Sequence, residues 1–293
     1  MSEVPAIDAV CNLWTEEALA HRPEGRDAFY RDKMRVHSDT YSGVSLADLL
    51  ARMDAACIER AFLIAHRCGP VGPRACWRLP YALVADAVAA HPDRFCGLAG
   101  IDPTEGMDGV RALDHAVREL GFIGAHAYPH WFELAPNNAR WYPFYAKCVE
   151  LEVPIQIQVG QSMIYAPDYP LESVGRPITL DPVACHFPEL TLIGIHIGIP
   201  WAEEMIAMAW KHRNVFIGSD AHSPKYWPES FVRFLNSYGR EKVIFGTDFP
   251  VLEHGRTRSE IEALGLRAES KRGLLRDNTR RIYRLEERMS KEG

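Results

Sequence analysis

Short runs of apolar residues alternate along the whole chain with longer amphipathic segments. Each apolar run is bounded by glycine, proline or charged residues, which is typical of a short buried strand. The longer segments repeat their apolar residues at helical spacing, and the segment 45–58 begins at Ser45, a suitable helix N-cap. The pattern predicts eight strands, at 5–10, 60–65, 95–101, 121–127, 154–159, 190–196, 214–219 and 242–247.

Strands that alternate with helices in this way indicate a parallel sheet covered by helices. Eight of them in 293 residues predict a (β/α)8 barrel, an α/β fold that occupies residues 1–293 as a single domain. A doubly wound open sheet is the alternative. That fold favours a glycine-rich phosphate-binding turn after its first strand, and the segment AVCNLW at 9–14 contains no glycine.

Composition narrows the classes of partner. Apolar residues make up 47% of the chain and charged residues 25%, as in ordinary globular proteins, and the net charge of −6 comes without a basic stripe. We therefore expect a small-molecule substrate and no nucleic acid. No signal peptide and no membrane-spanning run of roughly 20 apolar residues is visible, so we expect a cytoplasmic protein without membrane contact. Assembly into a homo-oligomer stays open.

Polar side chains stand at the carboxyl ends of the predicted strands, where a barrel builds its active site. A histidine there is more often a hydrogen-bonded structural residue, but the strand ends of a closed barrel converge on one mouth. We expect Asp248, His196 and His126 to be catalytic. Helix capping is the alternative explanation for Asp220 and His222, which follow the seventh strand. The residues expected to bind substrate are Asn12, His66, His130, Trp131, Gln158 and His222.

Four stretches resemble a known family: GRPITLDPVACHFPEL at 175–190, LIGIHIGIPW at 192–201, VIFGTDFP at 243–250 and LLRDNTRRIY at 274–283. With them the chain, from about Val4 to Leu285, resembles the amidohydrolase-related barrels that include aminocarboxymuconate-semialdehyde decarboxylase. The resemblance implies a His-x-His metal-binding pair after the first strand, where this chain has Val10 and Asn12. It also implies a histidine on the fifth strand, where this chain has Gln158.

Only His196 and Asp248 remain of the ligands that the resemblance implies, and two interpretations stay open. One divalent cation such as zinc is held at a displaced site by His196 and Asp248, with His126. Alternatively, the enzyme works without metal, and Asp248 and the histidines are its general acid and base. In either case the first strand is not expected to bind zinc, because Val10 has no ligand atom and Asn12 offers only a neutral amide.

The main functional prediction is a hydrolase that cleaves a carbon–carbon, lactone or (thio)ester bond. Asp248 would be its general base, and His196 its electrophile or metal ligand. Trp131 and nearby aromatic residues favour a small aromatic substrate, with an acyl-CoA as another option. A non-oxidative decarboxylase, which is a lyase, is the alternative, although the missing first-strand pair argues against it. A catalytically inactive barrel that binds a ligand is the third hypothesis.

Overall fold

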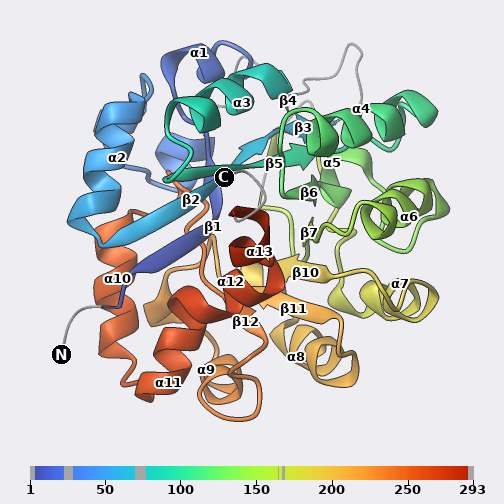
Figure 1. Ribbon diagram of the computed structural model, residues 1–293. Coiled ribbons are helices and arrows are strands. Elements are labelled where there is room, and N and C mark those ends of the chain that lie inside the picture. Colours follow the sequence, from blue (N-terminus) through green and yellow to red (C-terminus); the bar gives the residue numbers. More distant parts are fainter. Residues whose placement is uncertain (1–3, 23–28, 70–76, 164, 167–168, 290–293) are drawn as a thin grey trace.

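Eight parallel strands form a closed ring in the computed structural model, which describes residues 4–22, 29–69, 77–163, 165–166 and 169–289 (Figure 1). Neighbours in the ring follow the order of the chain. The strands are β1 (Ala6–Asn12), β2 (Ile58–Ala65), β5 (Phe95–Gly100), β6 (Gly124–Ala127), β7 (Ile155–Gln158), β10 (Leu192–Ile195), β11 (Val215–Gly218) and β12 (Val243–Ile244).

Backbone hydrogen bonds between the first strand and the segment after β12 close the ring. The Ala9 N–H donates to the Phe245 carbonyl at 3.0 Å, and the Asp248 N–H donates to the Val10 carbonyl at 2.7 Å. Closure confirms the predicted (β/α)8 barrel and excludes the open doubly wound sheet. Every predicted strand overlaps one strand of the ring, because each short apolar run is buried on both faces.

Helices surround the ring in Figure 1. Ser45 caps the N-terminus of α2 as expected, since its Oγ accepts a hydrogen bond from the Asp48 N–H at 3.1 Å. None of the helices in the described ranges is long and apolar enough to cross a membrane. The helices are α1 (Glu16–Leu19), α2 (Leu46–Ala55), α3 (Tyr81–Ala90), α4 (Met107–Arg118), α5 (Pro129–Phe132), α6 (Tyr142–Glu150), α7 (Leu180–His186), α8 (Ala202–Lys211), α9 (Glu229–Leu235), α10 (His254–Ala263), α11 (Ala268–Arg272), α12 (Asn278–Ile282) and α13 (Leu285–Met289).

The C-terminal helices α12 and α13 lie over the middle of the strand ring in Figure 1. Tyr283, which follows α12, is fully buried, and its ring packs edge-on against Phe62 of β2 with the ring centroids 4.8 Å apart. Its hydroxyl accepts a hydrogen bond of 2.8 Å from the Gln156 side chain on β7. The last turn of the chain therefore fills one end of the barrel and leaves the other end for a site.

A buried polar cluster fixes the seam between the first and last strands. Both carboxyl oxygens of Asp8, which is fully buried, accept hydrogen bonds. Its Oδ1 receives the Val10 N–H at 3.2 Å and the Thr247 N–H at 2.9 Å, and its Oδ2 receives the Thr247 hydroxyl at 2.5 Å and His254 Nε2 at 2.9 Å. The seam therefore sets the path of the backbone immediately before Asp248.

Candidate functional site

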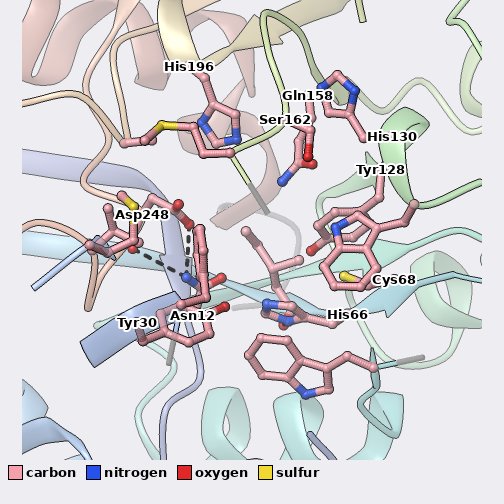
Figure 2. Close-up of a pocket in the computed structure, with 18 of the residues that line it drawn as sticks. Asn12, Tyr30, His66, Cys68, Tyr128, His130, Gln158, Ser162, His196 and Asp248 are labelled. Carbon is pink, nitrogen blue, oxygen red and sulfur yellow. Dashed lines mark hydrogen bonds between the residues drawn. The ribbon is translucent and has the colours of Figure 1, made fainter. Parts of the chain in front are cut away.

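One cavity at the carboxyl ends of the strands brings the predicted site residues together (Figure 2). It has an empty volume of about 860 Å³ including its opening, which is the size of a small-ligand pocket. All nine candidates line it: Asn12, His66, His126, His130, Trp131, Gln158, His196, His222 and Asp248. The convergence expected from the closed barrel is therefore present.

His196 is held at the end of β10 by the buried carboxylate of Asp220. His196 Nδ1 lies 2.6 Å from Asp220 Oδ2, and the His196 backbone N–H donates to Oδ1 at 3.0 Å. Burial lowers the pKa of His196, but the charge and hydrogen bond of Asp220 outweigh it, so that this pKa lies above its ordinary value. The Asp220 pKa is lowered, because the same pairing outweighs the burial of its carboxyl. The pairing with Asp220 therefore favours the protonated form of His196.

Asp248 presents its carboxyl to the cavity beside Asn12. The Asn12 Nδ2 donates to Asp248 Oδ1 at 2.9 Å, as Figure 2 shows. It also donates to the Phe249 carbonyl at 2.7 Å. Burial raises the pKa of Asp248 to about 7, and the nearby carboxyls of Asp220 and Asp8 raise it further, against the lowering effects of His196 and Asn12. A carboxyl with this pKa exchanges protons near neutral pH.

His126 is locked in one tautomer by Gln156, a fully buried residue of β7. The Gln156 amide nitrogen donates to the Ala9 carbonyl at 2.7 Å and to the Tyr283 hydroxyl at 2.8 Å. Its oxygen therefore faces His126 Nδ1 at 2.9 Å, so Nδ1 carries the hydrogen and Nε2 carries a lone pair. Burial lowers the pKa of His126 to about 3, which keeps this ring neutral.

Aromatic rings form one wall of the cavity. The His66 ring stacks on the Trp77 ring, with the ring centroids 4.0 Å apart. It also stacks on the Tyr128 ring, with the centroids 5.8 Å apart. In Figure 2 this wall, with Tyr128 and Cys68, lies across the cavity from Asn12 and Asp248. His66 Nδ1 donates to the Ile64 carbonyl, and burial lowers the His66 pKa to about 4. The wall therefore offers flat, uncharged surfaces to a ligand.

The two remaining histidines of the cavity lining, His130 and His222, have lowered pKa values. Burial lowers the pKa of His130, on α5, to about 4, and that of His222 to about 4 as well. Trp131 follows His130 on α5, and Gln158 ends β7. Lysine and arginine are absent from the cavity lining in the described ranges, and His196 is the lining histidine whose pKa is raised.

Sequence reasoning missed two residues that control this site. Helix capping was left as an alternative explanation for Asp220, whose carboxylate holds His196; its position two residues after β11 was the signal. Gln156 alternates with Gln158 on β7, and its buried neighbour His126 lies on the adjacent strand. Tyr30 also lines the cavity, from the long polar insertion after β1 that carried no obvious motif.

The described residues do not provide a metal centre in this cavity. Ligands of one zinc ion, at about 2.0–2.3 Å from it, lie within about 4.6 Å of one another. No three ligand atoms from histidine, cysteine or acidic side chains of the described cavity residues come within 4.8 Å of one another. The structure therefore does not assemble His126, His196 and Asp248 as a ligand set, and these residues do not fit a bound metal.

Two groups elsewhere in the described ranges do meet that spacing. Asp8, Cys11 and His254 lie in the seam, where the Asp8 oxygens already accept four hydrogen bonds. Asp181, Cys185 and His212 lie on α7 and at the end of α8, where Lys211 also contacts Asp181. Neither group faces the cavity.

The backbone at the mouth is strained. His196, Ile197, Ala221 and Asp248 all have positive φ angles, of 68°, 60°, 63° and 55°. Left-handed conformations are costly for residues with a side chain, and they cluster at sites where a precise orientation is maintained. The strained backbone conformations therefore occur at His196 and Asp248 themselves and at residues next to the site.

A comparison with protein families decides the identity of this barrel. The amidohydrolase family model matches residues 7–285. The chain belongs to the amidohydrolase family. The resemblance inferred from the sequence motifs is therefore confirmed, and this barrel is an enzyme of the amidohydrolase superfamily.

Two curated relatives and one solved structure place the barrel more closely. A gamma-resorcylate decarboxylase of Rhodococcus jostii is 24% identical over 278 residues, covering 78% of each chain. A 2-keto-4-carboxy-3-hexenedioate hydratase of a Sphingobium species is 38% identical over 88 residues, which is 27% of this chain and 26% of the hydratase. The 5-carboxyvanillate decarboxylase of Novosphingobium aromaticivorans, solved with manganese and 4-hydroxy-3-methoxy-5-nitrobenzoic acid, has a TM-score of 0.71 at 18% identity, covering 96% of both chains; this likeness shows the fold.

These relatives correct the hydrolase prediction, which is wrong. Decarboxylases recur among the matched proteins, and a decarboxylase was the alternative reading. The physical reason lies in Asp248. Burial raises the pKa of Asp248 to about 7, so that a share of this carboxyl is protonated at neutral pH. Such a group is suited to donate a proton.

Proposed function

We propose that this amidohydrolase-family enzyme is a non-oxidative decarboxylase, a lyase that releases CO₂ from a small aromatic acid. The observation that carries the proposal is the Asp248 carboxyl, held by Asn12 and facing the same cavity as the Asp220-paired His196 ring. A proton donor and a single cationic ring meet there beside an aromatic wall. The gamma-resorcylate decarboxylase relative, which aligns over most of both chains, supports this choice of reaction.

The reaction needs one proton and one bond cleavage. Asp248 gives its carboxyl proton to the ring carbon that bears the substrate carboxylate. The bond between that carbon and the carboxylate then breaks, its electron pair restores the aromatic ring, and CO₂ leaves. Solvent returns a proton to Asp248, so that one carboxylate and one proton become an arene and CO₂. A carboxyl that titrates near neutral pH suits both halves of this cycle.

His196 and His126 are assigned complementary roles. The His196 imidazolium, stabilised by Asp220, attracts the substrate carboxylate into the cavity and holds it before cleavage. The neutral His126 presents the lone pair of Nε2, which has no hydrogen-bond partner in the structure. It can accept a hydrogen bond from a ring hydroxyl of the substrate, and this interaction places electron density on the carbon that is protonated.

The cavity lining favours an acid with a single carboxylate. His66, Tyr128 and Trp77 supply flat surfaces for stacking, and His196 supplies the positive charge. A second carboxylate or a phosphate would be buried without a cationic partner among the described lining residues, which is costly. The acyl-CoA option is therefore not proposed.

The test is an assay of CO₂ release from hydroxybenzoic acids, with the monocarboxylate 2,6-dihydroxybenzoate as the first substrate. We expect CO₂ and the corresponding phenol in equal amounts, and a loss of at least about 100-fold in turnover for Asp248→Asn. Exposed Asp86→Asn on α3 is the control, because it makes the same change far from the cavity's polar groups. Equal turnover in wild type and Asp248→Asn would contradict the role given to Asp248.

A hydratase is the second candidate, because the Sphingobium hydratase has the higher local identity. Hydration of a carbon–carbon double bond also needs a proton donor opposite an anion-binding group. Incubation with 2-keto-4-carboxy-3-hexenedioate distinguishes the two reactions. Loss of its conjugated absorbance without CO₂ release would favour the hydratase over the decarboxylase.

A further inference from the structure

We propose that this site works without a metal ion, and that the side-chain amide of Asn12 takes the place of a cation beside Asp248. The inference concerns the cofactor of the site and does not depend on which bond the enzyme cleaves. It rests on the position of Val10 and Asn12 at the end of β1, on the orientation of the Asn12 amide, and on the spacing of the remaining ligand atoms.

Val10 fills the interior of the barrel with methyl groups. It is fully buried, and a β-carbon built on Gly246 would lie 3.0 Å from Val10 Cβ and 3.0 Å from Asp220 Cβ. The Val10 side chain therefore packs against Gly246, which follows β12, and lies close to Asp220. Val10 therefore offers no ligand atom to an ion at this position.

The orientation of the Asn12 amide follows from its partners. Its nitrogen lies 2.7 Å from the Phe249 carbonyl oxygen and 3.4 Å from the Asp248 carbonyl oxygen, and these two atoms can only accept hydrogen bonds. The NH₂ group, and not the amide oxygen, must therefore face them and Asp248 Oδ1 at 2.9 Å. Its hydrogens carry partial positive charge toward the carboxyl and repel a cation there.

The amide also performs the mechanical task of a bridging ion. It links the end of β1 to two successive residues after β12 and fixes one carboxyl oxygen of Asp248 (Figure 2). A cation would hold Asp248 as an anion, whereas a neutral amide orients the carboxyl and lets it keep a proton. Asn12 is therefore a positioning residue for the proton donor.

The other possible ligand atoms of the described cavity residues are too far apart to bind an ion together. His196 uses Nδ1 for Asp220, which leaves only Nε2. No two further ligand atoms of described cavity residues lie within 4.8 Å of Nε2 and of each other. Two ligands alone do not make a tight site for zinc or manganese.

The experiment measures metal binding without substrate, so its outcome is separate from that of the decarboxylation assay. The full-length protein is stripped with a chelator, dialysed against MnCl₂ or ZnCl₂, and passed into metal-free buffer. Metal content is measured by elemental analysis, and the melting temperature is measured with and without each ion. We expect much less than about one ion per chain at this site and no rise in melting temperature with Mn²⁺.

Asn12→Asp tests the amide directly, because it removes the NH₂ donors and places a second carboxylate beside Asp248. We expect Mn²⁺ to bind this variant at least about tenfold more tightly than wild type and to raise its melting temperature. Asn137→Asp, at an exposed position, is the matched control and should gain nothing. A folded Asn12→Asp variant that gains no affinity for Mn²⁺ overturns the role of the amide.

The wild-type measurement decides the question even if Asn12→Asp fails to fold. About one tightly bound ion per wild-type chain that is lost in Asp248→Asn would overturn the proposal. Zinc that persists in Asp248→Asn but is lost in Cys185→Ser lies on the surface group of Asp181, Cys185 and His212, and leaves this cavity metal-free as proposed.

Discussion

Asp220 raises the pKa of His196 from a position for which helix capping was the alternative explanation. Its carboxylate has two contacts with His196, one to the ring and one to the backbone N–H. The site's other histidines lack such a partner, and burial lowers the pKa of each of them. One buried carboxylate therefore separates the ring whose pKa is raised from the four rings whose pKa values are lowered.

Asp220→Asn should remove this distinction. Without the anion, burial dominates, so we expect the His196 pKa to fall and turnover to drop by about 10–100-fold as the substrate carboxylate loses its partner. NMR titration of the imidazole signals measures the first effect and kinetics the second. Asp181→Asn is the control, because Asp181 accepts from His212 Nε2 at an equally short 2.6 Å outside the cavity. An unchanged His196 titration would refute this account.

Asp248 should give the activity a descending limb near neutral pH. Its folded-state pKa is about 7, and the protonated form, which predominates below that pH, is the proton donor. Turnover should therefore be level at about pH 5–6 and fall about tenfold per unit well above pH 7. A pH–rate profile of CO₂ release checks this. A profile that instead rises through pH 7 would mean that the ionised carboxylate is the active form.

The last strand of the barrel is very short and is held in place by contacts with β1. β12 contains two residues, and the chain after it joins β1 through Asp8 and a few backbone bonds. The Asp8 carboxyl gathers four donors from β1, from Thr247 and from α10. This seam determines the direction in which Asp248 leaves the strand, so stability and site geometry depend on the same contacts.

Asp8→Asn should weaken the seam. The new amide nitrogen would face a donor where an oxygen now accepts, leaving buried donors unpaired at a cost of about 2–3 kcal/mol in the free energy of unfolding. Urea denaturation measures it. The exposed Asp86→Asn substitution should change that free energy by less than about 0.5 kcal/mol. Equal stability of the two variants would show that the seam does not depend on the Asp8 oxygens.

At the scale of the whole molecule, the barrel could be predicted because its strands pair in the order in which they occur along the chain. Eight short buried runs joined by helices have few arrangements, and the strand ends then bring His126, His196 and Asp248 to one mouth. What the pattern could not reveal depends on contacts across the ring. Asp220 meets His196 from another strand, and Gln156 meets His126 likewise.

The reaction itself was also beyond the sequence pattern. The sequence shows the same aspartate at a strand end whether its carboxyl accepts a proton from water or donates one to carbon. Only burial in the folded barrel raises the pKa of Asp248 toward neutrality, against the lowering effect of the Asn12 amide, and the relatives then favour a decarboxylase. Cytoplasmic location and homo-oligomer formation remain predictions.

The closed end of the barrel supports the site from below through Tyr283. Its ring is 1% exposed against Phe62, and its hydroxyl receives the Gln156 amide that in turn orients His126. Tyr283→Ala should open a cavity, leave a Gln156 donor unpaired, and lower the free energy of unfolding by about 3–5 kcal/mol. Trp210→Ala, which removes a larger ring that is 74% exposed, should cost less than about 1 kcal/mol.

Tyr283→Phe separates the two effects, since it keeps the ring and removes the hydroxyl. It should lower the free energy of unfolding by about 1 kcal/mol. It should also leave the His126 ring less firmly oriented, which a shift of the His126 imidazole NMR signals would reveal. If Tyr283→Phe leaves those signals unchanged, the end of the chain stabilises the barrel without reaching the site.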